Sequence, residues 1–146
     1  MLAAAAVVGL CWHSSVAAKS CSATATGVNF GNYDPQSGVP DDAPGTLSLE
    51  CNGGGRSAFA TVSLGTGNSG NFAFRSMGNG ASFLQYNLYA DSARAIVWGD
   101  GSGGTSTVDV PVNFGLGSRT IYGRIPSGQL VSAGAYSDLI VVTIDF

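Results

Sequence analysis

Apolar and polar residues alternate with a period of two along most of the chain from Cys21 onward. Successive side chains of a β-strand point to opposite faces, so this alternation predicts strands with one apolar face. The expected inward rows are Leu47, Leu49 and Cys51; Ala58, Ala60, Val62 and Leu64; Leu84, Tyr86, Leu88 and Ala90; Val108, Val110, Val112 and Phe114; and Ile121, Gly123 and Ile125. Pro111 has no backbone N–H, which predicts that its strand is an edge strand or a bulged one.

Glycine-rich turns separate these runs at short intervals, among them GTGNSGN, MGNGA, GDGSGG and GLGS. No run shows a helical period. A single domain with about seven or eight short strands is therefore expected, arranged as an all-β sandwich or a small barrel.

The chain ends on an unusually apolar stretch, YSDLIVVTIDF. Chain ends are usually frayed and polar, because few contacts hold them. Here the row of Ile140, Val142, Ile144 and Phe146 and the row of Leu139 and Val141 are both apolar, which is typical of a strand buried on two sides.

The start of the chain predicts export. Residues 1–18 form a short apolar run followed by small residues, with signal-peptide cleavage expected after Ala17 or Ala18, which leaves residues 19–146 as the domain. One feature differs from the usual signal-peptide pattern, since no Lys or Arg follows Met1. A lipoprotein anchor at Cys11 is disfavoured, because Leu10 stands where a small residue is required. Cleavage leaves one pair of cysteines, Cys21 and Cys51, for a disulfide in an oxidising compartment.

Composition excludes several functions. A net charge of -3 with six basic residues does not provide the cationic surface that nucleic-acid binding requires. His13 is the single histidine and leaves with the signal peptide, so no His-dependent triad or His-ligated metal site is available. Glu50 is the only glutamate and lies on the outward face of its strand, which argues against a paired-carboxylate hydrolase. We expect no catalytic residue, no metal and no cofactor.

Two acidic loops and one aromatic group are candidate binding sites. Asp34, Asp41 and Asp42 lie in one loop and Asp100 and Asp109 in another, but turn formation explains both loops better than calcium binding. The aromatic group consists of Trp98, Tyr89, Tyr86 and Phe83. These side chains could form a platform that stacks on sugars or could simply pack between strands, and the sequence does not distinguish the two.

Several stretches, in this order, closely resemble the spore coat protein U domain, the family that includes subunits of archaic, Csu-type chaperone–usher pili. They are CSATATGVNFGNYDPQSG, LSLECNGG, FAFRSMGNGASFLQYNLYAD, IVWGDGSGGT and IYGRIPSGQLVSAGAYSDLIVVTIDF, and they run from Cys21 to Phe146. Each stretch alone is weak evidence, but their order and spacing together are specific.

The resemblance implies an immunoglobulin-like β-sandwich that lacks its last strand and is completed by a donor strand. Its partners would be a periplasmic chaperone, an outer-membrane usher and neighbouring pilin subunits, with no nucleic acid and no integral membrane span. The protein would pass through the periplasm to the surface fimbrium of a Gram-negative bacterium. The edge that meets chaperone and donor strand would be Leu139, Ile140, Val141, Val142, Thr143, Ile144, Asp145 and Phe146.

One departure from the family concerns the other end. Polymerising relatives carry a donor segment before the first cysteine, whereas here little more than Lys19 and Ser20 precede Cys21 after the expected cleavage. This favours a tip or terminal subunit of an adhesive, non-enzymatic fibre that serves in biofilm attachment. The alternative is a secreted spore-coat-like sandwich that binds a surface polymer or calcium without assembling into fibres.

Overall fold

The computed structural model describes residues 19–52 and 58–146, so the expected signal peptide, residues 1–18, lies outside the described residues. The strands are β1 (Ser20–Thr26), β2 (Asp41–Asn52), β3 (Ala58–Leu64), β4 (Arg75–Asn79), β5 (Ser82–Tyr89), β6 (Val108–Asn113), β7 (Leu116–Ile125) and β8 (Val142–Asp145). One short 3₁₀ helix, η1 (Gly67–Ser69), follows β3. The prediction of an all-β domain is confirmed.

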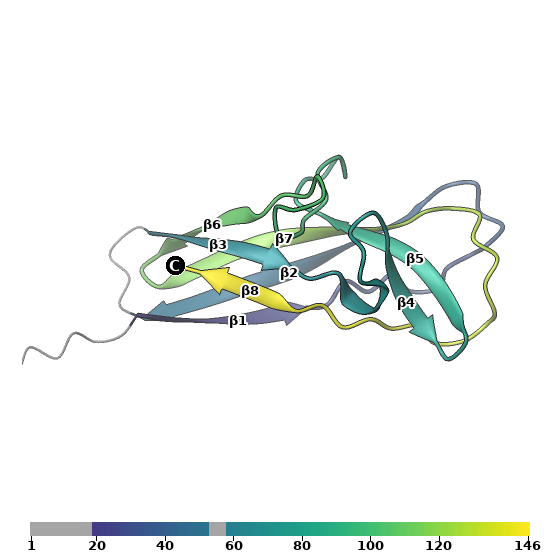
Figure 1. Ribbon diagram of the computed structural model, residues 1–146, viewed down its shortest axis with the longest axis horizontal. Coiled ribbons are helices and arrows are strands. Elements are labelled where there is room, and N and C mark those ends of the chain that lie inside the picture. The colour runs from purple at the N-terminus through teal and green to yellow at the C-terminus, as the bar shows by residue number, and fades with distance from the viewer. Residues whose placement is uncertain (1–18, 53–57) are drawn as a thin grey trace, which may run out of the picture.

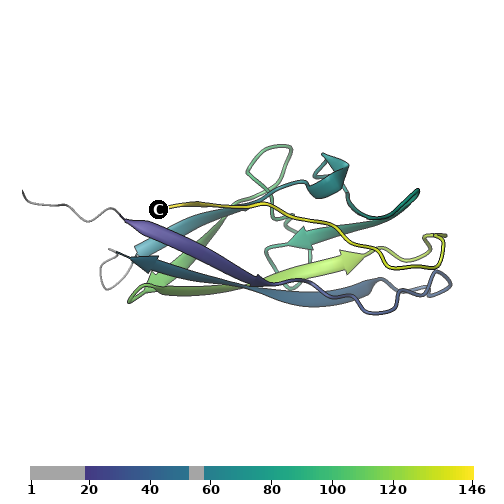
Figure 2. The same ribbon diagram turned by 90° about the horizontal axis from the view of Figure 1, so that it is seen from below.

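The strands form one strongly curved antiparallel sheet in the order β1-β2-β7-β6-β3-β8. β5 pairs with the last part of β7 and carries β4 on its other side. The molecule is elongated (Figures 1 and 2), and β1 and β8 lie toward the same end with their arrows in opposite directions (Figure 1). The two outer members of the sheet order therefore approach each other, as expected for an immunoglobulin-like sandwich that is almost closed.

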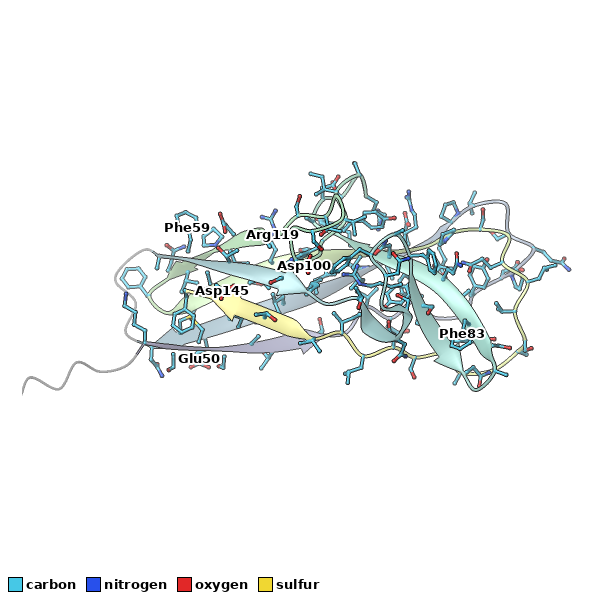
Figure 3. The ribbon with its side chains drawn as sticks, viewed as in Figure 1. Glu50, Phe59, Phe83, Asp100, Arg119 and Asp145 are labelled. Carbon is cyan, nitrogen blue, oxygen red and sulfur yellow. A yellow bond between two sulfur atoms is a disulfide. The ribbon has the colours of Figure 1, made fainter. Side chains whose placement is uncertain are left out.

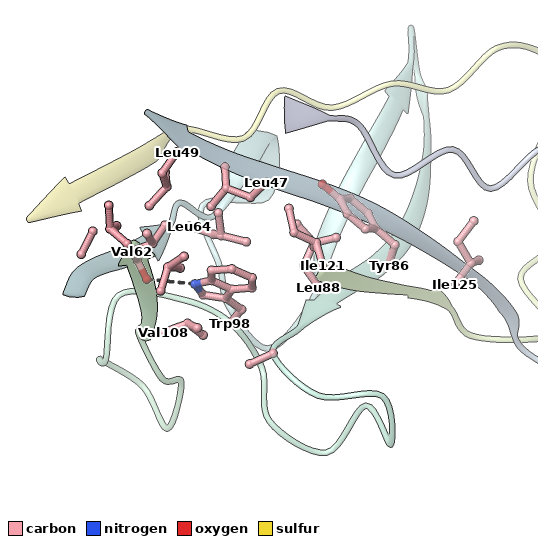
Figure 4. Packing of buried hydrophobic residues seen from close by; sticks show 14 of the residues in the cluster. Leu47, Leu49, Val62, Leu64, Tyr86, Leu88, Trp98, Val108, Ile121 and Ile125 are labelled. Atoms are coloured by element: carbon pink, nitrogen blue, oxygen red, sulfur yellow. Dashed lines mark hydrogen bonds between the residues drawn. The ribbon is translucent and has the colours of Figure 1, made fainter. Parts of the chain in front are cut away.

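The core lies where the inward rows of β2, β3, β5, β6 and β7 meet (Figure 4). Leu47, Val62 and Val110 are fully buried, as the alternation predicts. Trp98 is also fully buried, and its indole Nε1 donates a 2.9 Å hydrogen bond to the backbone oxygen of Val62. Burying the ring together with its N–H partner satisfies both the apolar and the polar part of the side chain.

The prediction that Phe114 points inward is wrong. Asn113 pairs with Leu116 at the end of β6 and β7, so Phe114 and Gly115 are the two residues of a tight hairpin turn. Both have positive φ, 52° and 86°, which is typical of the type I′ turn that joins twisted strands. The Phe114 side chain is 80% exposed because the chain reverses there instead of continuing the strand.

The prediction of an edge strand around Pro111 is also wrong, since β6 lies between β3 and β7. Pro111 is paired with Phe59 on the β3 side, while the β6–β7 ladder consists only of Val112 with Gly117 and Asn113 with Leu116. Proline is tolerated because it lies just beyond the point where the ladder with β7 ends.

β1 is joined to β2 by a ladder and by a disulfide. Cys21 is opposite Cys51 in the register, and the two sulfur atoms are bonded. The covalent link lies near one end of β1, and the Thr26 hydroxyl closes the ladder at the other end by accepting a 3.0 Å hydrogen bond from the Thr46 N–H.

Candidate functional site

An open cleft separates β1 from the C-terminal segment, by which we mean Ser137–Asp145. A cavity of about 380 Å³ lies between them, and its lining includes Ala25 and Thr26 from one side and Leu139, Ile140 and Val142 from the other. Its lining also includes the core residues Leu64, Tyr86, Leu88 and Ile121. The hydrophobic core is therefore directly accessible through the gap between the two edges of the sheet.

The side chains along both edges show that a cover is missing. Ala25 is opposite Leu47 and shares its face of the sheet, yet Leu47 is fully buried while Ala25 is exposed. Ile140, Val142 and Ile144 pack against the core but are only half-buried. Leu139 and Val141, on the opposite face, are 81% and 67% exposed.

The C-terminal segment is fixed to the rest of the fold at three points. Ser137 exchanges two backbone hydrogen bonds with Gly78 of β4, at 2.9 and 3.1 Å. Gly65 donates a backbone hydrogen bond of 2.8 Å to Val141, which extends the pairing of β3 with β8. Between these two points the segment is held by the side chain of Asp138.

Asp138 accepts three hydrogen bonds, from η1, from β5 and from the next residue of its own segment. Its Oδ1 accepts the N–H of Asn68 in η1 at 2.9 Å and the N–H of Leu139 at 2.8 Å, and its Oδ2 accepts the Tyr86 hydroxyl at 2.7 Å. Burial, together with this bond to a carboxylate, raises the pKa of Tyr86 far above its usual range. Tyr86 therefore stays neutral and anchors the C-terminal segment to β5 throughout the physiological pH range.

One backbone edge of this segment faces the cleft. Hydrogen bonding alternates along an antiparallel strand, so residues with the parity of Val141 point their N–H and C=O toward β3. Val142 and Ile144 have the opposite parity, and their backbone groups point toward β1. The same two residues turn their side chains to the core, so the cleft offers hydrogen-bonding groups and apolar surface together.

A second cavity of about 1050 Å³ continues the cleft beyond the end of β1. It lies between residues 27–35 and residues 131–136, and it shares Gly27, Val28, Phe30, Met77 and Tyr136 with the first cavity. Tyr33 fixes the first of these loops by donating a 3.1 Å hydrogen bond to the oxygen of Pro126 and accepting one of 2.8 Å from the N–H of Gln129.

Comparison with known proteins agrees with this architecture. The family model described as the Spore Coat Protein U domain matches residues 8–143. The chain belongs to this family. Protein U of Myxococcus xanthus is 36% identical over an alignment of 135 residues, and the match covers 82% of this chain and 71% of that protein.

A solved structure shows the same fold as this spore coat protein U domain. It is a chain of the CsuC–CsuE chaperone–tip adhesion subunit pre-assembly complex from the archaic chaperone–usher Csu pili of Acinetobacter baumannii. The TM-score is 0.61 at 22% identity, over 88% of this chain and 40% of the matched chain. This chain therefore corresponds to less than half of that one.

The segment predicted as the partner-binding edge of the domain, Leu139–Phe146, is found beside the cleft but is only partly a strand. Regular β-structure covers Val142–Asp145, and the preceding residues are held by Asp138 instead of a continuous ladder. In the single chain one of its two apolar rows packs on the core and the other is exposed, so two-sided burial does not hold there. Its role toward a partner stays a prediction.

The acidic loops of the domain are used in turns and pairs. Asp34 and Asp100 accept backbone N–H groups two residues ahead, from Gln36 and Ser102. Asp109 accepts the Thr61 hydroxyl at 2.7 Å. Over residues 19–52 and 58–146, no three His, Cys, Asp or Glu side chains gather in a geometry that could hold a metal ion.

Asp42 belongs to an ion-pair cluster with Arg124 and Arg94. It accepts two hydrogen bonds from Arg124, at 2.7 and 2.8 Å, and lies 3.2 Å from Nε of Arg94. The hydrogen bond from Arg124 is the main cause that lowers the pKa of Asp42, with the charge of Arg94 helping and burial opposing. Asp41 next to it has a raised pKa, from burial and from the charge of Asp42.

The aromatic group proposed from the sequence does not form a platform. Trp98 and Tyr86 are buried in the core of the domain, whereas Phe83 is 59% exposed on the outward face of β5 (Figure 3). Strand packing therefore explains Trp98 and Tyr86. Within the described residues, no helix has the length and apolar character needed to cross a bilayer.

Sequence reasoning missed two charged residues whose side chains hold the fold together by hydrogen bonds, Arg75 and Asp138. Arg75 is fully buried and donates hydrogen bonds to Gly65 O, Trp98 O and Asn87 Oδ1, at 2.9, 2.7 and 2.6 Å. Burial lowers the pKa of its guanidinium, and the oxygen partners offset the cost of burying the group. An arginine inside the apolar stretch FAFRSM was the available signal. Asp138 gave no signal, because its partners are distant in sequence.

Proposed function

We propose that this chain is a non-enzymatic subunit of an archaic chaperone–usher pilus that accepts a β-strand from a partner in the cleft between β1 and the C-terminal segment. The observation that carries the proposal is the cleft itself, in which two sheet edges face each other across exposed core. Membership of the spore coat protein U family and the fold shared with a chain of the Csu complex support it.

The topology defines how such a strand would pair. Neighbouring strands are antiparallel throughout the order from β1 to β8, which makes β1 and β8 run in opposite directions. A strand inserted between them would be antiparallel to one edge and parallel to the other. It would satisfy the backbone groups of Val142 and Ile144 and cover Ala25, which is how strand addition provides both affinity and register.

The partners follow from this mechanism. A periplasmic chaperone would fill the cleft first, a neighbouring subunit would replace it, and an usher would deliver the fibre to the surface of a Gram-negative cell. Attachment to surfaces, biofilm formation and a place at the fibre tip belong to the same proposal, supported by the tip adhesion subunit in the matched complex. The leader in residues 1–18 would direct export.

Expression in a Gram-negative periplasm, with and without the cognate chaperone, tests the proposal. We expect the chain alone to aggregate or be degraded, because the open cleft exposes core residues, and we expect a stable one-to-one complex when the chaperone is present. A protease-resistant monomer that forms without any partner would contradict the proposal.

A pair of variants at one position separates edge pairing from packing. Ile144→Pro removes an N–H that faces the cleft and the apolar side chain, whereas Ile144→Ala removes most of the side chain and keeps the N–H. We expect chaperone binding to be retained at reduced strength by Ile144→Ala and lost by Ile144→Pro. Equal binding of the two variants would show that the edge does not pair with the partner.

The second candidate is a secreted, spore-coat-like sandwich that binds a surface polymer or calcium without entering a fibre. The higher identity to Protein U, 36% against 22% for the pilus structure, favours it. Deleting this chain distinguishes the two functions: loss of pili supports the first, whereas intact pili with lost polymer binding support the second.

A further inference from the structure

Phe30 stands in the cleft at the place where its two cavities meet. The residues that line both cavities come from the segment after β1, from β4 and from the position just before the C-terminal segment. Three of them carry large side chains, Phe30, Met77 and Tyr136, and all three are half-buried. These three side chains therefore lie at the boundary between a cavity of about 380 Å³ and one of about 1050 Å³.

The sheet beneath Phe30 prevents the ring from sinking deeper. A Cβ atom at Gly123 would lie 2.7 Å from Cζ and 3.0 Å from Cε1 of Phe30, so the ring already rests on the backbone of β7. Val28 is seated in the same way over Gly45, where a Cβ atom would lie 2.9 Å from its Cγ2. The two glycines admit these side chains because they carry no Cβ.

Sideways movement of Phe30 is restricted by Tyr86. The two rings pack edge to face, with centroids 6.0 Å apart and an interplanar angle of 69°. Tyr86 cannot shift freely, since its hydroxyl is held by Asp138 at 2.7 Å. The hydrogen bond that anchors the C-terminal segment thus also fixes the position of Phe30.

Met77 and Tyr136 are the other two large side chains at this boundary. Tyr136 is tied back by a 2.7 Å hydrogen bond from its hydroxyl to the oxygen of Ser132. Met77 contributes a flexible, unbranched side chain that can adopt several rotamers. Of the three large side chains at this boundary, Phe30 is the one that rests on the backbone of β7.

From this geometry, and resting on the proposed strand-accepting function, we infer that Phe30 selects the size of one side chain in the partner strand. The strand carries a small residue, glycine or alanine, where it passes Phe30. Bulky apolar residues fit at the inward positions on either side, because the two cavities lie there. Phe30 thereby sets the register of the inserted strand and discriminates among donor sequences.

A strand supplied by the chain itself tests this inference. The full chain is extended after Phe146 by a flexible turn and a strand of alternating Thr and Ala, which can fold back into the cleft. In a series of variants each inward Ala is replaced in turn by Trp, and the midpoint of thermal unfolding is measured, after refolding in vitro, against the unextended chain. We expect the extension to raise the midpoint, and one Trp position to lose most of that gain.

Substitution of Phe30 then identifies the cause. Phe30→Ala in the extended chain is expected to restore tolerance of Trp at that one position and to leave the other positions unchanged. Phe30→Leu provides a second, milder enlargement, which covers the case in which Phe30→Ala does not fold. Phe83→Ala, an exposed phenylalanine on β5, serves as the matched control and should restore nothing.

The outcomes test the strand-accepting function and the role of Phe30 separately. If no extended chain gains stability, the strand-accepting function fails and the inference falls with it. If the extension stabilises the chain but all inward positions tolerate Trp equally, the cleft accepts strands and only the role of Phe30 is overturned. The role of Phe30 is also overturned if neither Phe30 variant restores the stability of the chain with Trp at the sensitive position.

Discussion

The inward rows of β3 and β6 and those of β1 and β8 follow the same alternation, but the structure buries them to different extents. Val62 and Val110, on the closed side, are fully buried, since paired strands flank them on both sides. Ala25 of β1 is exposed and Ile144 of β8 is half-buried, because nothing in the described chain covers the gap between them. The same sequence pattern thus produces a core on one side and an acceptor surface on the other.

The two sides also differ in what holds them together. The closed side depends on packing and on buried hydrogen bonds around Trp98 and Arg75. The open side depends on discrete links, namely the Cys21–Cys51 disulfide for β1 and the Asp138–Tyr86 hydrogen bond for the C-terminal segment. Such links keep both edges in place and leave the cleft free for a partner.

The largest effect is expected on the closed side, from Trp98→Ala. Removing a fully buried indole leaves a cavity and removes the hydrogen bond from its N–H to the Val62 oxygen, so the free energy of unfolding should fall by about 3–5 kcal/mol. Urea unfolding of the chain that carries the strand extension after Phe146 measures this loss, with Phe83→Ala as the exposed control, for which we expect little change. Similar losses for both variants would mean that the closed side does not contain the stabilising core.

Removal of the disulfide should have the next largest effect, on the open side. The Cys21→Ser/Cys51→Ser variant opens a link between residues 30 apart, which should lower the free energy of unfolding by about 3–4 kcal/mol. Hydrogen exchange should show early opening of β1 while β3 stays protected. If β3 and β1 opened together, β1 would not be the separately held edge that we describe.

Tyr86→Phe should have an intermediate effect that couples the two sides. Loss of the bond to Asp138 should lower the free energy of unfolding by about 1–2 kcal/mol. Amide exchange at Leu139 should become faster, since its N–H is held by the same carboxylate. A double-mutant cycle with Asp138→Ala isolates the pair, and additive effects would show that the hydroxyl does not anchor the segment.

The smallest effect is expected from the ion pair of Asp42 and Arg124 on the outer surface of the closed side. The lowered pKa of Asp42 means that its contribution is complete above its ordinary pKa of 3.8 and is lost as the pH falls through the lower folded-state value. Because the carboxylate is about one-third exposed, Asp42→Asn should cost less than about 1 kcal/mol at pH 7.

Urea unfolding at pH 7 and pH 3, in low and high salt, measures this contribution. The difference between the native chain and Asp42→Asn should shrink at pH 3 and in high salt. A difference that grows as the pH falls would have the wrong sign for a carboxylate stabilised in its charged form. A cost as large as that of Trp98→Ala would show that surface pairing, and not the core, stabilises the closed side.

Much of the closed side could be predicted from the sequence. The inward rows of β2, β3, β5 and β7 follow the alternation because side-chain direction in a strand is a local property. Phe114 was predicted incorrectly since the same alternation continues into a turn, and FG is a weaker turn signal than NG or DG. The pairing of Cys21 with Cys51 was accessible from a count of cysteines, and the structure contains that disulfide.

The cleft was less accessible, because its residues are brought together by topology. Phe30 packs on Gly123, and Asp138 accepts the Tyr86 hydroxyl, across separations that no local pattern reports. Family resemblance predicted an unfilled groove beside the last strand, but it did not predict which side chains line that groove.

By itself, the sequence determined the strands, most of their inward faces and the position of the turns, because backbone geometry and side-chain alternation act over a few residues. Only the tertiary structure decided which edges stay unpaired. β1 and β8 end the sheet order and approach each other without pairing, and this depends on the pairing of all the strands between them. The apolar end of the chain is thus one wall of an open cleft, whose floor is the core that the rest of the sequence encodes.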